Sequence, residues 1–539
     1  MLPALRHFIL CLGFLCATGT LAATLERWVY VQVNLLVPEE VQRLEALMRR
    51  AQPLGLGHFV LADPKFSRIS ELDRRYRDHV QRVRKLAAEL GIEIVPAIFP
   101  VGYSNSLLWH DPNLAEGLPV RDALFVVSNG VARVVADPPV ALPSLLERRR
   151  WGFIDDNLQP DDGGLRVTDT KGANARAMIR VTVSPFRHYH LSVRIRTRDF
   201  RGTPEIKVLV GADRNLTYTS LGAKGTQEWR THHVTFNSLE HTNVAVYFGA
   251  WGAGSGSLWL ADPQLAEAGP VNILRRNGCP VAVRLENGRQ LIEGEDFEPL
   301  RDPRMGNQPW AGEYEVWHDA PPLITRQPDG TRLRVSYFHP HIVYDGQVCA
   351  CPSEPKFDEL LEREAREVHA AWAARAYMMS HDEWRVLGWD EACRRRGVDA
   401  GELVADNSRK CVAWLRALNP GGRILVWSDM FDPHHNAVAE YYLVRGDLRG
   451  AWTGLDPDVV IMNWNSAKRQ ESLKFFSERG HRQVLAGYYD AGPEQIAAWL
   501  EATRGIKGVA GVMYTTWQRN FADLEAFARV VDRFERSPK

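Results

Sequence analysis

The sequence predicts an α/β protein, a (β/α)8 TIM barrel with a large all-β insertion after its third strand. Three strands separated by helices open the chain before residue 100, and five further strand-helix units run from about residue 355 to the C-terminus. Between them lies a long stretch with the pattern of closely spaced antiparallel strands. Three and five strands make eight, the number of parallel strand-helix units that close naturally into a barrel.

The N-terminal strands are short apolar segments separated by amphipathic helices. Pro38 followed by two acidic residues is a typical helix start, and Gly91 ends the second helix. After Pro100 this alternation stops. The predicted strands are 28–36, 58–63 and 92–99, and the predicted helices are 38–51 and 71–90.

The alternation returns near Pro355 and continues to the end of the chain. Apolar runs of strand length are followed by amphipathic segments of helix length, as in parallel sheets with helical crossovers. The predicted strands are 376–382, 423–429, 458–464, 482–489 and 508–516, and the predicted helices are 354–373, 400–418, 466–479, 493–504 and 523–536.

The strand-rich insertion divides into two parts. Residues 148–267 have the short strands and turn signals of a β-sandwich, and the strand-rich pattern then continues to residue 350. The predicted segments are a signal peptide at 1–23, the first part of the barrel (strands 1–3) at 24–143, the sandwich at 148–267, a connecting segment at 268–350, and the second part of the barrel (strands 4–8) at 351–539.

The sandwich segment resembles jelly-roll carbohydrate-binding modules. The similar stretches are Tyr-His-Leu-Ser-Val-Arg-Ile-Arg-Thr at 189–197 and Gly-Ser-Leu-Trp-Leu-Ala-Asp at 256–262. This resemblance implies a carbohydrate partner, such as an oligosaccharide, polysaccharide or glycoconjugate. Four tryptophans are candidates either for a sugar-stacking platform or for core packing: Trp151, Trp229, Trp251 and Trp259.

The composition argues against a nucleic-acid partner. Lys plus Arg equals Asp plus Glu at 66 each, whereas nucleic-acid-binding domains usually carry a basic excess. The chain contains 17 Trp, and indole faces suit the stacking of sugar rings as well as the filling of cores.

The N-terminus has the pattern of a secretory signal peptide. Arg6 and His7 precede an apolar run too short to span a bilayer, and the small residues at 20–23 suit cleavage. We therefore expect an exported protein with no transmembrane segment after signal removal. Five cysteines remain beyond residue 23, an odd number with no evident disulfide framework, and the spacing of Cys349 and Cys351 is too short for a typical zinc knuckle.

Two adjacent carboxylates end the predicted fourth strand. Asp382 and Glu383 follow an apolar run of strand length, with His381 before them and Arg385 after them. In a parallel barrel, residues at the carboxyl ends of strands face the site where chemistry is usually located. We expect Asp382 and Glu383 to be catalytic, and His381 and Arg385 to contact substrate.

The later strands end in similar residue types. Aromatic rings and carboxylates recur on successive strands, and together they would build an aromatic-walled pocket with fixed acceptors for sugar hydroxyls. The further substrate-binding candidates are Trp427, Asp429, Trp464, Tyr488, Asp490 and Trp517.

The order of these motifs resembles the catalytic barrel of the family 20 glycoside hydrolases, the β-N-acetylhexosaminidases. The segment 352–361 is similar to the helix that leads to that family's H-x-G-G-D-E signature, which Asp382-Glu383 match. Trp427-x-Asp429 is similar to its W-x-E motif, Tyr488-x-Asp490 to its Y-L-D motif, and Trp517 to its last-strand Trp.

The resemblance implies a retaining, substrate-assisted cleavage of β-linked N-acetylhexosamine-type sugars without a cofactor or a metal. The acetamido oxygen of the substrate attacks the anomeric carbon. Glu383 would protonate the leaving oxygen, Asp382 would stabilise the intermediate, and Tyr488 would donate to the acetamido carbonyl. Trp427, Trp464 and Trp517 would form the pocket walls.

The chain departs from the family pattern at three places. Ser380-His381 replace the paired glycines, Gln32 and Asn34 stand on the first strand without the expected Arg, and Arg519 replaces an acid after the last-strand Trp. A shifted sugar specificity is the expectation that follows from these departures.

Three alternatives remain open from sequence. The first is a non-catalytic carbohydrate-binding or scaffold protein. The second is a glycosidase of different specificity that uses two carboxylates from different strands, such as Glu383 with Asp429 or Asp490. The third is a metal-dependent hydrolase, whose candidate ligands are His381, Asp429, Asp432, His434 and His435, although no metal-binding motif joins them.

Overall fold

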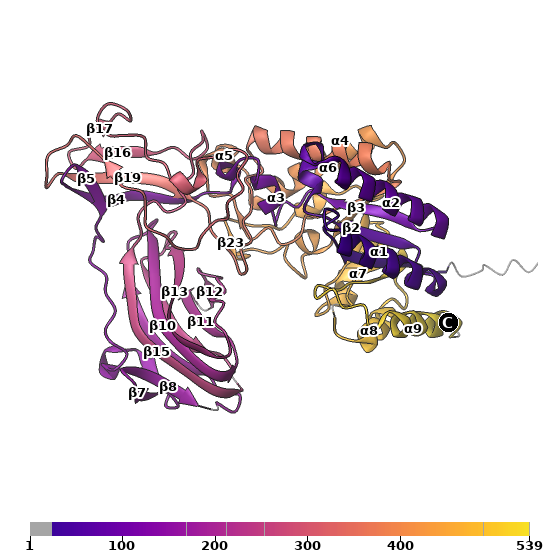
Figure 1. Cartoon of the computed structure of the whole chain (residues 1–539), viewed down its shortest axis with the longest axis horizontal. Helices are drawn as coiled ribbons and strands as arrows, with labels where there is room; N and C mark the ends of the chain where they lie inside the picture. The colour runs from indigo at the N-terminus through magenta and orange to yellow at the C-terminus, as the bar shows by residue number, and fades with distance from the viewer. Residues whose placement is uncertain (1–23, 169, 212, 253, 489, 538–539) are drawn as a thin grey trace, which may run out of the picture.

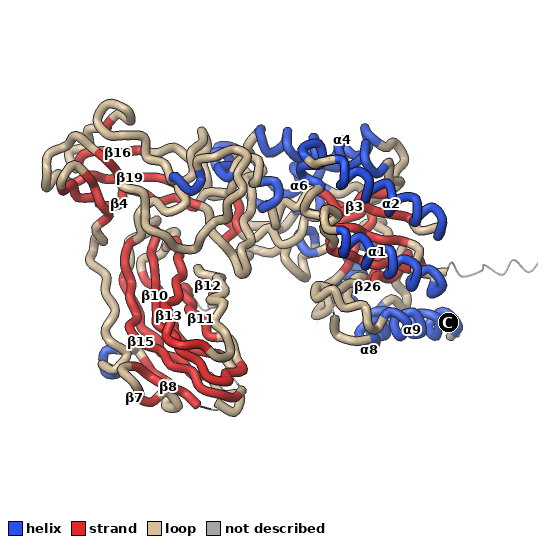
Figure 2. The backbone as a smooth tube through the Cα atoms, viewed as in Figure 1, coloured by secondary structure: helices blue, strands red, loops and turns tan. Residues whose placement is uncertain are grey.

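The computed structural model describes residues 24–168, 170–211, 213–252, 254–488 and 490–537. The predicted signal peptide at 1–23 lies outside these residues. Figures 1 and 2 show an α/β part, built from both ends of the chain, and two antiparallel β parts formed by the segment between. The predicted fold class is confirmed, since the α/β part is a closed barrel of eight parallel strands.

The barrel strands are neighbours in chain order, and the last strand pairs with the first. Trp28 of β1 pairs with His58 of β2, and Met378 of β20 pairs with Ala97 of β3, so the ring closes across the insertion. The strands are β1 (Glu26–Gln32), β2 (His58–Ala62), β3 (Glu93–Ile98), β20 (Ala376–Met379), β22 (Arg423–Trp427), β24 (Val460–Asn463), β25 (Gln483–Leu485) and β26 (Val509–Tyr514).

The helices that cover the barrel have recognisable start and stop residues. Asp73 accepts the Tyr76 N–H at the start of α2, and Gly91 ends that helix in the left-handed conformation with φ of 67°. Pro38 and Pro355 occupy the first positions of α1 and α4. The helices are α1 (Pro38–Ala51), α2 (Arg74–Leu90), α4 (Pro355–Trp372), α6 (Ala400–Leu418), α7 (Arg469–Glu478), α8 (Pro493–Ala502) and α9 (Leu524–Arg536).

Alternation along the strands divides the barrel core from the layer under the helices. In β20, Ala376 and Met378 belong to the apolar cluster inside the barrel, together with Trp28 and Trp427. Tyr377 and its alternate neighbours belong to the cluster between the sheet and the helices. This period of two decides which side chains beyond the end of the strand can face the barrel mouth.

The insertion between β3 and β20 contains a sandwich of two five-stranded antiparallel sheets (Figure 1). One sheet has the order β13-β10-β15-β8-β7 and the other β12-β11-β14-β9-β6. The strands are β6 (Phe153–Ile154), β7 (Gln159–Asp161), β8 (Gly164–Thr168), β9 (Ala175–Thr182), β10 (His188–Arg201), β11 (Pro204–Val210), β12 (Arg214–Asn215), β13 (Gln227–Asn237), β14 (Asn243–Ala250) and β15 (Ser255–Glu267).

A six-stranded antiparallel sheet stands next to the sandwich, with the order β17-β16-β19-β4-β5-β18. Its hairpin β4–β5, which the predicted segments group with the first part of the barrel, pairs with strands from residues 282–339, because Leu333 of β19 is aligned with Phe125 of β4. The strands are β4 (Leu118–Ser128), β5 (Val131–Val134), β16 (Ala282–Leu285), β17 (Gln290–Leu291), β18 (Leu323–Ile324) and β19 (Arg332–His339).

Short elements join these parts. Tyr218 of the sandwich segment stacks on Tyr442 of the barrel part, with ring centroids 4.3 Å apart, so the sandwich contacts a loop at the barrel mouth. The short elements are β21 (Val386–Leu387), β23 (Leu443–Val444), α3 (Asn105–Leu108), α5 (Glu391–Arg395) and the 3-10 turns Gln52–Leu54, Phe66–Glu71, Pro112–Leu114, Arg148–Arg150, Pro303–Met305, Asp429–Phe431 and Ala451–Gly454.

Across the residues that the structure describes, each helix is too short or too polar to cross a membrane.

Candidate active site

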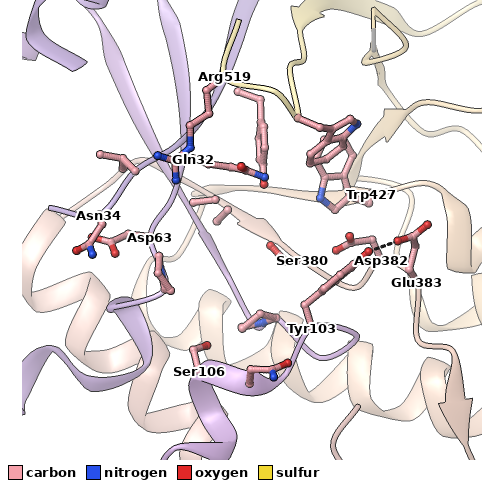
Figure 3. A pocket seen from close by; sticks show the side chains of 18 of the residues that line it. Gln32, Asn34, Asp63, Tyr103, Ser106, Ser380, Asp382, Glu383, Trp427 and Arg519 are labelled. Carbon is pink, nitrogen blue, oxygen red and sulfur yellow. Dashed lines mark hydrogen bonds between the residues drawn. The ribbon is translucent and has the colours of Figure 1, made fainter. Parts of the chain in front are cut away.

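A cavity of about 1030 Å³ opens at the carboxyl ends of the barrel strands (Figure 3). Asp382, Glu383 and Ser380 come to it from the end of β20, and Tyr103 reaches it from the loop after β3. The other lining residues are Tyr30, Gln32, Val33, Asn34, Glu40, Ala62, Asp63, Pro64, Ala97, Pro100, Asn105, Ser106, Asp345, Glu364, Arg385, Trp427, Trp464, Trp517 and Arg519.

Asp382 faces this cavity because the alternation of β20 continues past the end of the strand. Met378 lies inside the barrel, and Ser380 and Asp382 follow it on the same side. Burial, and then the nearby carboxylates of Asp429 and Glu383, raise the pKa of Asp382 well above its usual value. These surroundings therefore favour the protonated form of Asp382.

Glu383 is fixed by four contacts. Its backbone adopts a positive φ of 49°, its N–H donates to Asp429 Oδ2 at 2.8 Å, and its C=O accepts from Gln347 Nε2 at 2.9 Å. Its carboxylate accepts a hydrogen bond from the Tyr103 hydroxyl and forms a 2.5 Å ion pair with Arg385. These contacts fix the position of the Glu383 carboxylate at the edge of the cavity.

Arg385 is held among aromatic rings rather than presented to solvent. Its guanidinium lies 5.0 Å from the ring centroid of Tyr344 and 4.9 Å from that of Tyr442. It donates to the Tyr103 hydroxyl at 3.2 Å and to Gln347 Oε1. Arg385 lines the cavity as predicted, but most of its donors hold Glu383 and its neighbours in place.

Three tryptophans form one wall of the cavity. Trp427, Trp464 and Trp517 come from the ends of β22, β24 and β26, as the strand-end pattern predicts. Trp517 lies 5.8 Å from Trp427 between ring centroids, and Tyr30 contacts both rings edge-on at 5.2 and 5.4 Å. Trp464 donates its indole N–H to Asp429 at 3.2 Å, which fixes the orientation of that ring.

His381 and Tyr488 point away from the cavity. His381 is fully buried, its Nε2 lies 3.0 Å from Asn407 Oδ1 of α6, and burial lowers its pKa to about 4. The hydroxyl of Tyr488 donates to Asp523 at 3.0 Å beside α9, and its ring stacks on Tyr514. Both side chains sit on the helix-facing side of their strands, which the strand alternation dictates.

Asp429 and Asp490 lie outside the cavity and hold residues that line it. Both accept backbone N–H groups at the barrel mouth: Asp429 from Glu383 at 2.8 Å, and Asp490 from Trp517 at 2.7 Å. Asp429 is fully buried and also accepts from Asn436 at 2.9 Å. Neither carboxylate is among the residues that line the cavity, so both orient the residues that do.

Sequence reasoning missed several lining residues. Tyr103 follows the break in the strand-helix pattern at Pro100, where no motif marks it. Asp63 ends the second predicted strand, and that position was a usable signal. Burial raises the pKa of Asp63 to about 6, although its carboxylate accepts from the Tyr76 hydroxyl at 2.9 Å and from the Leu35 N–H at 3.2 Å.

The residues at which the first and last strands depart from the family pattern lie on the side of the cavity opposite Glu383 (Figure 3). Arg519 forms a 2.9 Å ion pair with Glu40, and Glu40 accepts the Asn34 N–H at 2.6 Å. Gln32 and Asn34 line the same region. This side therefore offers amides and a guanidinium to a ligand.

The candidate metal ligands of the fifth strand have other partners. Asp432 accepts from Asn465 at 3.2 Å and from the Ser472 hydroxyl, and His435 packs edge-on against Trp464 at 4.5 Å. In the described ranges, the group of ligand-type side chains close enough to share an ion lies elsewhere in the molecule. This geometry does not favour a metal-dependent hydrolase at the barrel mouth.

Comparisons with known proteins give structural similarities only. No family model and no curated protein matches the chain. A family 20 exo-β-N-acetylglucosaminidase from Vibrio harveyi, solved with N-acetylglucosamine, is similar at 11% identity and a TM-score of 0.40, over 94% of this chain and 54% of that one. The β-N-acetylhexosaminidase of Bacteroides fragilis is similar at 10% identity and a TM-score of 0.39, over 96% of this chain and 68% of that one.

A family 4 carbohydrate-binding module is similar to part of the chain. It matches at 15% identity and a TM-score of 0.19, over 23% of this chain and 82% of the module. Because these identities and TM-scores are low, the similarities do not assign the chain to a family or an activity.

Proposed function

We propose that this protein is a glycoside hydrolase that cleaves a glycosidic bond in the cavity at the barrel mouth. One observation carries the proposal: two adjacent carboxyl groups, those of Asp382 and Glu383, line one cavity together with three tryptophans. Glycoside hydrolysis needs one carboxylic acid to protonate the leaving oxygen and one carboxylate to stabilise or form the intermediate. Indole faces provide the apolar surface on which a sugar ring stacks.

The surroundings of the two carboxyl groups favour a different assignment of the general acid and the stabilising carboxylate from the one that the resemblance implies. The resemblance implies Glu383 as the acid, but the Glu383 carboxylate forms an ion pair with Arg385 and accepts from the Tyr103 hydroxyl. Burial and neighbouring charges instead favour a proton on Asp382. We therefore propose that Asp382 protonates the leaving oxygen and that Glu383 stabilises the positive charge that develops at the sugar.

The proposed substrate is a β-linked 2-acetamido sugar, cleaved with participation of its own acetamido oxygen. The carboxylate pair and the tryptophan wall support this class, whereas Tyr488 donates to Asp523 and faces away from the cavity. The acetyl group would therefore contact the tryptophans and Tyr30 rather than Tyr488. A route with two carboxylates from different strands is disfavoured, because Asp429 and Asp490 accept backbone N–H groups outside the cavity.

The first experiment compares aryl β-glycosides with and without a 2-acetamido group. We expect cleavage of the acetamido substrates, and its loss in Glu383→Gln and Asp382→Asn. The matched controls are Glu501→Gln and Asp458→Asn, whose carboxylates form exposed ion pairs with Arg504 and Arg416. Cleavage of substrates without the acetamido group would keep a glycosidase but overturn the substrate-assisted route.

Leaving-group dependence then identifies the acid. A dinitrophenyl leaving group departs without protonation, so the variant that lacks the acid retains activity on it. We expect retention in Asp382→Asn and loss in Glu383→Gln; the reverse result would restore the roles that the resemblance implies. If no glycoside is cleaved while Glu383→Gln and the parent protein bind glycans equally, the chain is a carbohydrate-binding protein.

We also propose that the protein is exported. The proposal rests on the charged, apolar and small-residue pattern of residues 1–23. Mass spectrometry of the protein produced with its full N-terminus tests it, because cleavage near Ala23 is expected and an intact N-terminus would contradict it.

A further inference from the structure

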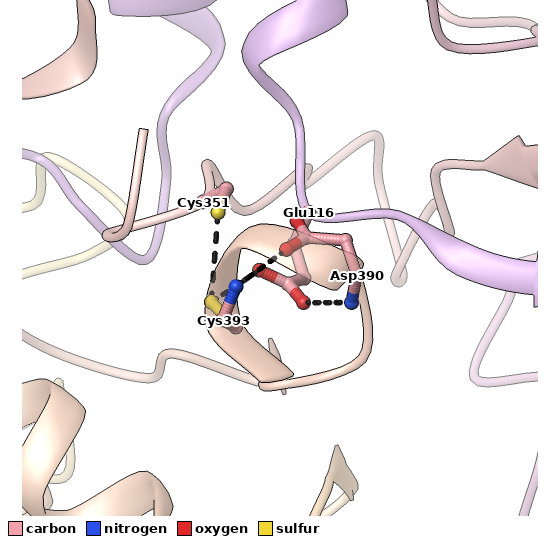
Figure 4. A group of neighbouring side chains, drawn as sticks. All are labelled: Glu116, Cys351, Asp390 and Cys393. Carbon is pink, nitrogen blue, oxygen red and sulfur yellow. Dashed lines mark hydrogen bonds between the residues drawn. The ribbon is translucent and has the colours of Figure 1, made fainter. Parts of the chain in front are cut away.

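A second group of reactive side chains lies at the base of the insertion, separate from the cavity. Glu116, Cys351, Asp390 and Cys393 are all buried, and one ligand-type atom of each lies within 4.8 Å of the others. Figure 4 shows the four side chains directed toward one another. They come from three separate chain segments, so no sequence motif brings them together.

The distances fit the edges of a tetrahedral metal site. The two sulfur atoms are 3.5 Å apart, and Cys393 Sγ lies 3.4 Å from Glu116 Oε2. Tetrahedral zinc with Zn–S bonds of about 2.3 Å and Zn–O bonds of about 2.0–2.2 Å requires edges of about 3.8 Å between sulfurs and about 3.5 Å between sulfur and oxygen. These two distances are within a few tenths of an ångström of the required edges, and the remaining distances between the four atoms are within 4.8 Å.

The inward-facing atoms have only weak partners in one another. Cys351 Sγ contacts Cys393 Sγ, and Glu116 Oε2 accepts from the Cys393 thiol, which is a weak donor. The hydroxyl of Ser353 also donates to Cys393 Sγ at 3.2 Å, as an outer partner of a thiolate would. The atoms that face the centre of the group therefore have weaker hydrogen-bond partners than the outer carboxylate oxygens.

The outward-facing atoms, in contrast, are held by strong donors. Glu116 Oε1 accepts the N–H groups of Trp389 at 2.6 Å and of Asp390 at 3.1 Å. Asp390 Oδ1 accepts the Cys393 N–H at 2.9 Å, and Oδ2 accepts from Arg276 at 2.6 Å. Outer partners of this kind orient the carboxylates of metal sites. Glu116 Oε2 faces the centre of the group, and an Asp390 oxygen would bind the ion with a lone pair that its present donor does not use.

The group lies where the insertion leaves the barrel part and returns to it. The Glu116 N–H donates to the Cys349 C=O at 2.8 Å, and the Cys351 N–H donates to the Leu114 C=O at 2.9 Å, so the outgoing and returning segments run side by side. Asp390 and Cys393 add the start of α5 to this pair. An ion there would join the outgoing segment, the returning segment and the barrel part.

We propose that Glu116, Cys351, Asp390 and Cys393 form a structural site for one zinc ion. Two thiolates and two carboxylate oxygens suit zinc, which binds both sulfur and oxygen and prefers four ligands in structural sites. Binding converts each thiol to a thiolate and each carboxyl ligand to a carboxylate, and every proton that these groups carry passes to solvent. No electron transfer is involved. The site fastens the base of the insertion and lies outside the catalytic proposal, so either can fail without the other.

The site also stabilises the segment that holds the catalytic pair. Gln347, four residues before Cys351, donates to the Glu383 C=O, and the Trp384 indole donates to the Ala350 C=O at 3.2 Å. Zinc removal is therefore expected to loosen this segment.

The test measures metal content and stability rather than activity. The full-length protein, produced in zinc-containing medium, is expected to carry about one zinc per chain by elemental analysis. A chelator should remove it and lower the melting temperature, and added zinc should restore that temperature. Replacement by cobalt should give the near-ultraviolet thiolate-to-metal absorption and the intense visible bands of a tetrahedral site.

Variants assign the ligands. Cys393→Ser and Glu116→Gln are expected to lose the zinc and the zinc-dependent stabilisation, whereas Cys411→Ser, a change at a buried cysteine of α6, should keep both. If Cys393→Ser does not fold, the cobalt spectrum of the parent protein and the Glu116→Gln variant still decide. Absence of bound zinc together with no response to added zinc, or a Cys351–Cys393 disulfide found by mass spectrometry, would overturn the proposal.

Discussion

The backbone N–H of Glu383 donates to Oδ2 of Asp429 at 2.8 Å. This hydrogen bond connects the loop after β20 to the 3-10 turn that follows β22. Glu383 has a positive φ of 49°, a conformation that costs a non-glycine residue of order 1 kcal/mol or more. The same Asp429 carboxylate accepts from Trp464 at 3.2 Å. One buried side chain thus holds both the backbone of Glu383, the proposed stabilising carboxylate, and the Trp464 ring in the cavity wall.

Asp429→Ala should lower kcat about 100-fold while changing KM by less than about threefold, because Glu383 would lose its fixed position without losing its carboxylate. Steady-state kinetics on the acetamido substrate measure both constants. Asp447→Ala, at a surface ion pair with Arg449, is the control. An unchanged kcat in Asp429→Ala would show that the hydrogen bond does not position Glu383.

Asp429→Asn should shift the pH profile instead. The charge of Asp429 is one of the causes that raise the pKa of Asp382, so its removal lowers that pKa. Because the acid must be protonated to act, the basic limb of the kcat/KM profile should move to lower pH. The profile measured between pH 4 and pH 10 checks this. A basic limb that stays in place would separate Asp382 from the role of acid.

Gly102 allows the loop after β3 to contact Asp382 and Glu383, the proposed catalytic pair. A Cβ at this position would lie 1.9 Å from the backbone oxygen of Asp382 and 3.0 Å from that of Glu383. Gly102→Ala must therefore displace the loop or the pair, and we expect kcat to fall by about 100-fold or more. Gly57→Ala is the matched control, since a Cβ there meets no atom within 4 Å. Equal kinetics in the two variants would contradict the close contact.

Trp517→Ala should weaken substrate binding more than catalysis. The indole forms the wall of the cavity next to Tyr30 and Trp427 and provides stacking surface for a sugar. Truncation of such an aromatic contact costs about 2 kcal/mol, which corresponds to a KM increase of roughly 30-fold. Trp251→Ala in the sandwich, where Lys207 covers the indole, should leave KM unchanged. A fall in kcat alone would assign Trp517 a different role.

The barrel was predictable because its sequence signal is periodic. The structure has all eight strands at the predicted places, and α1 and α6 have the predicted bounds. The direction of individual side chains was harder to predict, since one residue along a strand end changes the face. Ser380 and Asp382 face the cavity while His381 faces α6, and Tyr488 faces α9.

Contacts between segments far apart in the chain could not be predicted from the sequence pattern. Tyr103 reaches Glu383 across 280 residues, and Glu116 reaches Cys393 across 277. Neither pair has a spacing that a motif could encode, because the insertion alone sets the separation. For the same reason, the predicted segments group the hairpin β4–β5 with the first part of the barrel. Its partner strand β19 follows about 200 residues later in the chain.

The buried Glu364 carboxyl group makes the stability of the fold depend on pH. This fully buried carboxyl group of α4 accepts the Phe99 N–H at 2.8 Å, and burial raises its pKa to about 8. Between the unfolded value of about 4.3 and pH 8, the folded protein holds a proton that the unfolded chain has released. The free energy of unfolding therefore falls by about 1.4 kcal/mol per pH unit from this group, so its contribution is present at low pH and lost as the pH rises through 8.

Glu364→Gln removes this proton linkage while it keeps an oxygen that can accept the Phe99 N–H. We expect the loss of stability between pH 5 and pH 8 to be smaller in the variant by about 2–4 kcal/mol, measured by urea unfolding at each pH. Glu359→Gln, on the exposed face of the same helix beside Lys356, should show the parent dependence. If Glu364→Gln and the parent lose stability in parallel, the Glu364 carboxyl is charged in the folded protein, because water or a cation then reaches it through the cavity that it lines.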